Sequence, residues 1–149
     1  MLSQRYIFLT TFATCFTLII VTTSLQSPMN ALVTIILLVA ANIFMTFAWY
    51  GHLKLQEMGK IANTPLFLVI LGSWFIAFFE YSLQIPANRI GYIGNGGTFS
   101  LVQLKIIQEV ITLLVFSVFS FTVFKTQIQW NHLAAFFCLV LAVYFVFMK

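Results

Sequence analysis

Long apolar runs separated by short polar links fill most of this chain. Each run is close to the roughly 20 residues that cross a bilayer as an α-helix. The runs are Tyr6–Ser24, Ala31–Tyr50, Pro65–Ile85, Phe99–Phe124 and His132–Met148. No link is long enough to form a second domain. The pattern predicts an all-α integral membrane protein: a bundle of four core transmembrane helices, with the first run as a candidate extra transmembrane helix.

The first run differs from the later ones. It is rich in threonine, follows a short start that carries Arg5, and ends before Pro28 and Met29. Three interpretations of residues 1–28 stay open: a transmembrane helix, a signal-like segment, or an artefact of start-site choice, because Met29 would begin a self-sufficient protein. In each case we expect residues 29–149 to form the four-helix membrane domain.

The composition agrees with a lipid environment. The chain is 62% hydrophobic and 7% charged, with a mean hydropathy of +1.05, whereas a soluble domain carries roughly 25% charged residues. The net charge of +4 comes from scattered residues, so a nucleic-acid interface is not expected. Cys15 and Cys138 lie in apolar runs, and His52 and His132 lack metal-ligand spacing. The chain also has no Asp for a Ser-His-Asp set. We therefore expect no metal, no cofactor and no enzymatic activity.

The second run carries polar residues at helical spacing. Asn42, Thr46 and Trp49 are separated by four and three positions, which predicts that they share one face. Trp49 and Tyr50 are also typical of an aromatic belt at the membrane surface. Gly51 then predicts the end of this helix.

The third run contains Glu80, one of three acidic residues in the chain. Glu80 and Gln84 are one turn apart on one face. Glu80 lies about 22 Å from the helix start at Pro65, inside the hydrocarbon but nearer the far interface. We expect Pro86 to end this helix. Arg89, beyond it, is a candidate ion-pair partner for Glu80.

The fourth run carries both signs of charge. Lys105, Gln108, Glu109 and Thr112 are predicted to share one face, and Lys105 can pair with Glu109 at i, i+4. Glu109 lies about 15 Å from the helix start at Phe99, close to mid-bilayer. A charged residue at a helix centre costs roughly 2.5–3.5 kcal/mol. This stripe must therefore face protein or water, or Glu109 must be neutral.

Local signals predict how three helices begin. Thr64 is a candidate N-cap before Pro65, which suits the first helical position. Ser100 and Gln103 form a capping-box pattern at the start of the fourth helix. Asn131 is the candidate N-cap of the last helix. Between the third and fourth runs, Asn95-Gly96 is a strong turn signal.

Taken together, these residues predict a polar intramembrane site. The segment from Glu80 to Tyr92 is interpreted as its mouth, and Glu109 as nearer its floor. The candidate residues of this substrate or proton pathway are Glu80, Glu109, Lys105, Gln84, Gln108, Asn42, Thr46, Trp49 and Arg89.

Three segments resemble a known family. They are Asn42–Lys54, Phe79–Tyr92 and Gln103–Leu113, the last together with Trp130-Asn131-His132. They are similar to a family of small bacterial membrane proteins of unknown function that is assigned to the drug/metabolite transporter (DMT) superfamily. The resemblance covers about Met29–Lys149, and it implies four helices in the bacterial inner (plasma) membrane, crossing it several times.

The wider superfamily includes the small multidrug resistance proteins, four-helix subunits that work as dimers. Their essential carboxylate lies in the first core helix. The corresponding run here, Ala31–Tyr50, contains no acidic residue. The essential carboxylate of those proteins therefore has no counterpart in this run. If this chain couples to protons, it must use Glu80 or Glu109.

Two functions stay open from the sequence. The first is a small transporter, working as a homodimer in the lipid bilayer, that exchanges protons for a small-molecule substrate of unknown identity. The second is a non-transporting assembly or regulatory subunit, whose polar residues hold helices together.

Basic residues predict the orientation. With five spans, Arg5, Lys54, Lys60 and Lys125 fall on one side of the membrane. Arg89 and Lys149 fall on the other. The side with more basic residues is expected to be cytoplasmic.

Overall fold

The computed structural model describes residues 28–125 and 129–148. These form four α-helices and a short 3-10 helix: α2 (Pro28–Glu57), α3 (Leu66–Gly91), η1 (Ile93–Asn95), α4 (Leu101–Val123) and α5 (Trp130–Phe147). All four α-helices are long and apolar enough to cross a membrane, which confirms the predicted all-α membrane fold. The three interpretations of the N-terminal segment concern residues 1–28, of which residues 1–27 lie outside the described residues.

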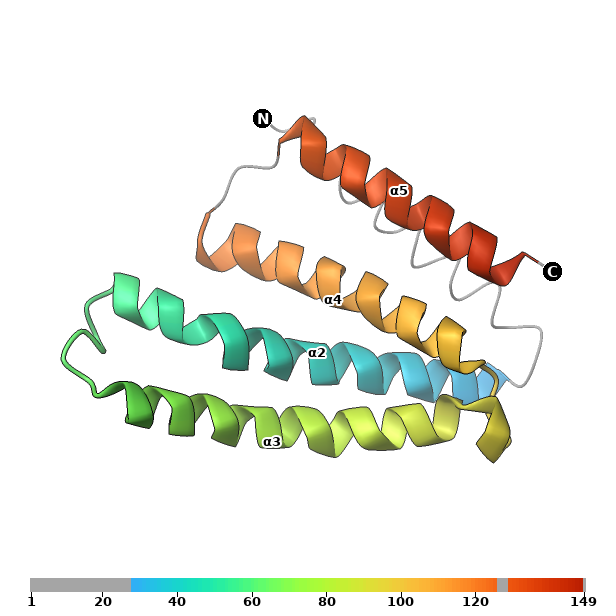
Figure 1. Ribbon diagram of the computed structural model, residues 1–149, viewed down its shortest axis with the longest axis horizontal. Coiled ribbons are helices and arrows are strands. Elements are labelled where there is room, and N and C mark those ends of the chain that lie inside the picture. Colours follow the sequence, from blue (N-terminus) through green and yellow to red (C-terminus); the bar gives the residue numbers. More distant parts are fainter. Residues whose placement is uncertain (1–27, 126–128, 149) are drawn as a thin grey trace.

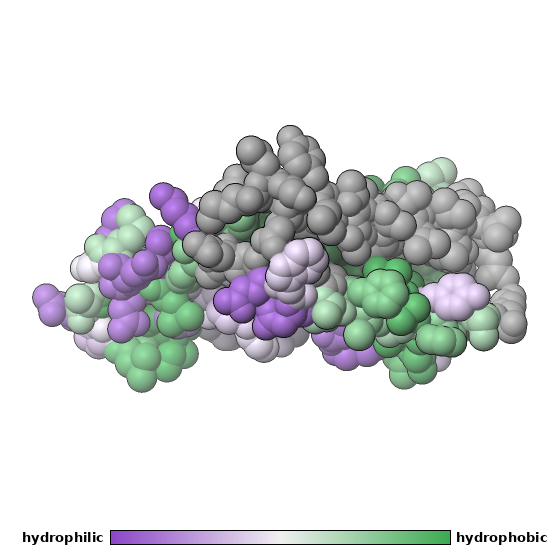
Figure 2. Space-filling view, turned by 90° about the horizontal axis from the view of Figure 1, so that it is seen from above, coloured by the Kyte–Doolittle hydropathy of each residue, from purple (hydrophilic) through white to green (hydrophobic). Residues whose placement is uncertain are grey.

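The helices alternate in direction and lie in the order α3, α2, α4, α5 (Figure 1). The α2–α3 connection and the last turn of α4 are therefore at the same end of the molecule. Consistent with this, the Lys54 ammonium lies 5.4 Å from the centroid of the Phe124 ring. Figure 2 shows hydrophilic side chains gathered at this end, on the left of the view.

The packed centre lies between α2 and α4, with the end of α3 against both. Fully buried side chains include Ile35, Leu38, Ile107 and Ile111. In a membrane, helices associate through close packing rather than through exclusion of water. Small residues of α2 such as Ala41, which is completely buried, bring the helix backbones close together. α3 and α5 expose most of their length instead.

The expectation that Pro86 ends the third helix is wrong, because α3 continues through it to Gly91. Proline removes one backbone donor, but helix-internal prolines are tolerated in membrane helices when neighbouring groups compensate. Close packing holds this last segment in place. A Cβ at Gly91 would lie 2.7 Å from Thr34 Cγ2 and 2.9 Å from Leu104 Cδ2, so α3, α2 and α4 meet at this glycine.

The predicted stop at Gly51 is also wrong, since α2 continues to Glu57. Glycine is tolerated inside a helix, and no proline follows it here. Lys54 lies in the last turn of α2, where a cation interacts favourably with the helix dipole. Its Nζ donates to Glu57 Oε2 at 2.8 Å.

The helix starts were predicted with mixed success. The capping box at α4 is confirmed: Ser100 N donates to Gln103 Oε1 at 3.0 Å, and Gln103 N donates to Ser100 Oγ at 3.3 Å. The other two N-caps lie one or two positions away from the predicted residues. Pro65 occupies the N-cap position of α3 with no capping side chain, and Gln129 rather than Asn131 is the N-cap of α5.

The link between α3 and α4 is held by backbone hydrogen bonds. Phe99 N donates to the Gly91 carbonyl, and Ile93 N donates to the Phe99 carbonyl, both at 2.8 Å. Gly96 adopts a left-handed φ of +80°, which confirms the predicted turn at Asn95-Gly96. The start of α4 is therefore fixed against the end of α3.

Candidate functional site

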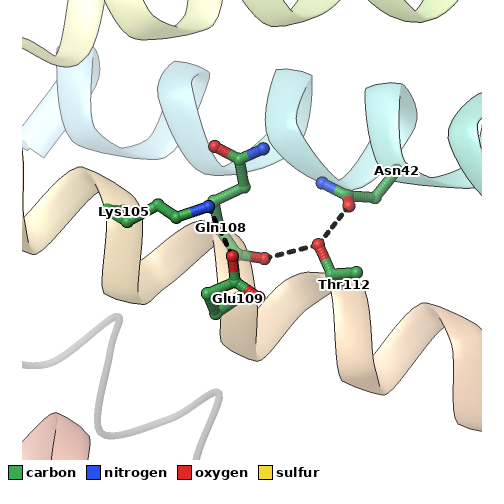
Figure 3. A network of polar contacts seen from close by, with 5 residues as sticks. All are labelled: Asn42, Lys105, Gln108, Glu109 and Thr112. Carbon is green, nitrogen blue, oxygen red and sulfur yellow. Dashed lines mark hydrogen bonds and ion pairs between the residues drawn. The ribbon is translucent and has the colours of Figure 1, made fainter.

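Asn42 and Thr112 connect α2 to α4 in the interior (Figure 3). The Thr112 hydroxyl lies 2.6 Å from Asn42 Oδ1 and 2.8 Å from the Gln108 carbonyl oxygen, so two acceptors share its single hydrogen. The Asn42 amide nitrogen donates to the Leu38 carbonyl at 2.7 Å. Asn42 is 1% exposed, so its amide is oriented by both helices.

The other buried hydroxyls of α2 bond within their own helix. Thr46 Oγ1 donates to the Asn42 carbonyl at 2.8 Å, and Thr34 Oγ1 donates to the Asn30 carbonyl at 2.7 Å. Such local bonds satisfy a hydroxyl without any partner helix. Thr46 and Asn42 therefore lie on the buried face as predicted, but both are largely occupied by protein groups.

Gln84 is different, because its side-chain amide has an unused donor. It is a buried residue of α3, 8% exposed, and its Nε2 has no hydrogen-bond partner within the described part of the chain. An unmet buried amide costs roughly 1–3 kcal/mol, which favours a ligand or water that could accept from it. On α4, the half-buried Gln108 side chain points toward α2 (Figure 3). Both amides thus lie on faces turned toward neighbouring helices.

Lys105 and Glu109 form the predicted i, i+4 ion pair, but they do not face the interior. Their side chains are 66% and 48% exposed, on the side of α4 away from Asn42. Glu109 and Thr112 were expected to share one face of α4, but their side chains point in different directions. Thr112 points to α2, whereas Glu109 points away from α2 (Figure 3).

Three other predicted residues lie apart from this cluster. Trp49 is 61% exposed, so it does not share the buried face of Asn42 and Thr46 and suits the predicted aromatic belt instead. Arg89 is exposed and Glu80 is half-buried. Within residues 28–125 and 129–148, the ion pairs are Lys54–Glu57 and Lys105–Glu109, so the suggested pair of Glu80 with Arg89 is not formed.

The order of the two carboxylates along the bundle is the reverse of that predicted. Glu80 precedes Gly91, the end of α3, by eleven residues, or about 17 Å along the axis. Glu109 follows Leu101, the start of α4, by eight residues, or about 12 Å. Both distances start from the same end of the molecule. Because α3 continues past Pro86, Glu80 lies farther from this end than Glu109.

A cavity of about 380 Å³ lies between α2 and α4. Its walls include Val39, Ile43, Ile111 and Leu114, and its hydroxyls come from Thr46 and Thr122. Both hydroxyls already donate to carbonyls of their own helices. The cavity therefore suits an apolar part of a molecule rather than a polar one.

Some functional features were missed by the sequence reasoning. Thr112 was placed on the polar face but not among the pathway residues, although it makes the α2–α4 hydrogen bond. Its spacing of one turn from Gln108 was the available signal. No cluster of three or more His, Cys, Asp or Glu that could hold a metal ion occurs in the described part of the chain.

Comparison with known proteins identifies the family of the chain. The sequence model of a family described as "Putative member of DMT superfamily (DUF486)" matches residues 34–147. That range contains the Asn42–Thr112 link, both intramembrane carboxylates and most of the four described helices. No curated protein and no solved structure shows significant similarity to the chain.

Proposed function

The chain belongs to this DMT-superfamily family, and from that premise we propose that it is a small transporter that exchanges protons for a cationic or polar small molecule. The observation that carries the proposal is Glu80, a half-buried carboxylate that has no ion-pair partner among the described residues and lies in a helix long and apolar enough to span the membrane. Ionisable residues inside membrane segments are costly and mark ion or substrate pathways. The proposal places the protein in a bacterial inner membrane, with the Lys54 end in the cytoplasm.

Glu80 is the better candidate than Glu109 for proton exchange. The Glu109 carboxylate is already compensated by Lys105, whereas no cation pairs with Glu80 among the described residues. A cationic substrate can therefore replace a proton at Glu80 without breaking an existing ion pair. Gln84 lies one turn along α3, and its Nε2, which has no acceptor among the described residues, can donate to a polar substrate.

A homodimer is part of the proposal. Charged side chains are costly where they face lipid, yet Lys105 and Glu109 are both exposed. A second copy packed on this face of α4 would cover the pair. Because the patch carries one positive and one negative group, a two-fold axis can place Lys105 of each copy beside Glu109 of the other.

Transport into proteoliposomes tests the proposal. Vesicles holding the reconstituted protein and an internal pH dye are exposed to a panel of lipophilic and polar cations. Exchange of entering cations for leaving protons makes the lumen more alkaline. We expect this signal from the wild type and Glu109→Gln, and its loss in Glu80→Gln.

Glu57→Gln is the matched control, because it also removes one acidic group but lies in the last turn of α2. Its signal should equal that of the wild type. Wild-type vesicles that never become alkaline with any cation, while the protein is fully helical, would argue against transport.

One observation favours the alternative of a non-transporting assembly or regulatory subunit. Asn42 and Thr112 satisfy each other across α2 and α4, and the hydroxyls of Thr46 and Ser82 are satisfied within their helices. These contacts suit helix–helix association. Under this alternative, added cations leave the pH of the lumen unchanged with the wild type, and the same holds for Glu80→Gln and Glu109→Gln.

A further inference from the structure

A second cavity, of about 450 Å³, lies at the end of the molecule that carries the α2–α3 connection. It is formed between α2 and α3, and the last turns of α4 close its third side through Phe119 and Val123. Its polar walls include His52, Lys54 and Thr64. Hence it combines an apolar interior with polar groups at the level where α2 reaches the membrane surface.

The His52 ring has an unused hydrogen-bonding capacity. Its Nδ1 is buried and has no hydrogen-bond partner in residues 28–125 and 129–148. A buried N–H without an acceptor is rarer in proteins than an unused acceptor, so we assign the ring hydrogen to Nε2. No group in the described part of the chain accepts from this imidazole, so Nε2–H is available to an acceptor in the cavity.

The apolar wall forms a strip along α3. Leu68, Gly72 and Ile76 line the cavity at intervals of one turn, over about 12 Å of helix axis. A Cβ at Gly72 would have nothing within 4 Å. The glycine therefore leaves open space in this wall of the cavity, which forms a groove beside α3.

The charges at this end favour an anion. Lys54 lines the cavity, and Lys60 and Lys125 lie at the same end. The acid that faces Lys54 is Glu57, whose Oε2 accepts from Lys54 Nζ at 2.8 Å. Glu57 is 59% exposed, so an anionic head group can compete with it for the ammonium.

We propose that this cavity binds an anionic phospholipid of the surrounding bilayer. The head group accepts hydrogen bonds from His52 and Lys54, and one acyl chain lies along Leu68, Gly72 and Ile76. The bilayer itself supplies a molecule with this combination of a negative head and a long apolar chain. The proposal does not depend on transport, since Glu80 does not line this cavity.

Native mass spectrometry of the purified full chain in detergent tests the site. The probe is phosphatidylglycerol, with phosphatidylcholine of the same acyl chains as the neutral comparison. We expect the wild type to retain phosphatidylglycerol about fivefold more strongly, as one added cation–lipid attraction implies. Gly72→Leu fills the groove and should weaken retention about tenfold. Leu71→Phe, which adds bulk to an exposed position of α3, should leave it unchanged.

Charge variants test the head-group contacts. Lys54→Gln and His52→Ala should each weaken retention several-fold, whereas Glu57→Gln should strengthen it because it removes the competing acceptor. Lys60→Gln changes the net charge as Lys54→Gln does, but Lys60 does not line the cavity, so retention should not change.

Three results would overturn the proposal. The first is equal retention of the two lipids. The second is an equal effect of Lys54→Gln and Lys60→Gln, which would mean diffuse surface attraction. The third is displacement of the lipid by inorganic phosphate together with no effect of Gly72→Leu, which would mean a site for small anions.

Discussion

At the residue scale, Thr112 makes the hydrogen bond that ties α4 to α2. Its hydroxyl lies within hydrogen-bonding distance of Asn42 Oδ1 on the other helix and of the Gln108 carbonyl on its own. If Asn42 is replaced, the hydroxyl keeps the bond to its own helix. The interhelical bond therefore contributes less than a wholly unsatisfied group would cost.

A double-mutant cycle measures this bond. We expect Asn42→Leu and Thr112→Val to be coupled by roughly 0.6 kcal/mol, the average for interhelical bonds in membrane proteins. The measurement is the free energy of unfolding in detergent titrated with SDS. Thr122→Val is the control, because the Thr122 hydroxyl bonds only within α4, and it should show no coupling to Asn42→Leu. Coupling near zero for both pairs would contradict the geometry.

Gly91 shows what residue-level reasoning from sequence cannot supply. Because Pro86 was expected to end the third helix, Gly91 was expected to lie outside it. In the structure it is the contact point of three helices, with Thr34 and Leu104 against its α-carbon. Only the distance between helices distinguishes these two roles, and no local pattern encodes that distance.

At the scale of the elements, apolar run length predicted the four spans well because lipid thickness fixes it. The capping box of Ser100 and Gln103 was predictable for a similar reason, since all its atoms lie within one turn. The continuation of α3 through Pro86 was not predictable, because tertiary packing overrode a local preference. The direction of Glu109 was not predictable either, because the stripe of Lys105, Gln108, Glu109 and Thr112 is wide. One part of it faces α2 and another part faces away.

The outward-facing ion pair of α4 gives a prediction for oligomerisation. If two copies pair Lys105 with Glu109 across a two-fold axis, Lys105→Glu and Glu109→Lys should each weaken the dimer, because like charges then meet. The double variant restores opposite charges and should restore the dimer. Subunit counting by single-molecule photobleaching in liposomes gives the readout. A dimer fraction that is the same in both single variants would exclude this face as the interface.

At the scale of the whole molecule, polar groups occupy three separate places. The Asn42–Thr112 link lies inside, Lys105–Glu109 lies on the outer side of α4, and Glu80 with Gln84 lies on α3. The sequence predicted one continuous pathway through all of them. In the structure the rotation of the helices separates these groups, and rotation depends on packing between helices.

This separation makes the role of Glu80 the central claim. The pair on α4 is internally neutral and the Asn42 link is hydrogen-bonded, so neither offers a free group to a cation. Glu80 has no cationic partner among the described residues, and the neighbouring amide of Gln84 is unused. A substrate that binds within one subunit should therefore act at Glu80.

Proton release from the purified protein tests this claim most directly. The protein is placed in unbuffered detergent solution, a lipophilic cation such as tetraphenylphosphonium is added, and the pH is recorded. The account predicts acidification with the wild type and with Glu109→Gln, and none with Glu80→Gln. Acidification that persists in Glu80→Gln and disappears in Glu109→Gln would contradict it.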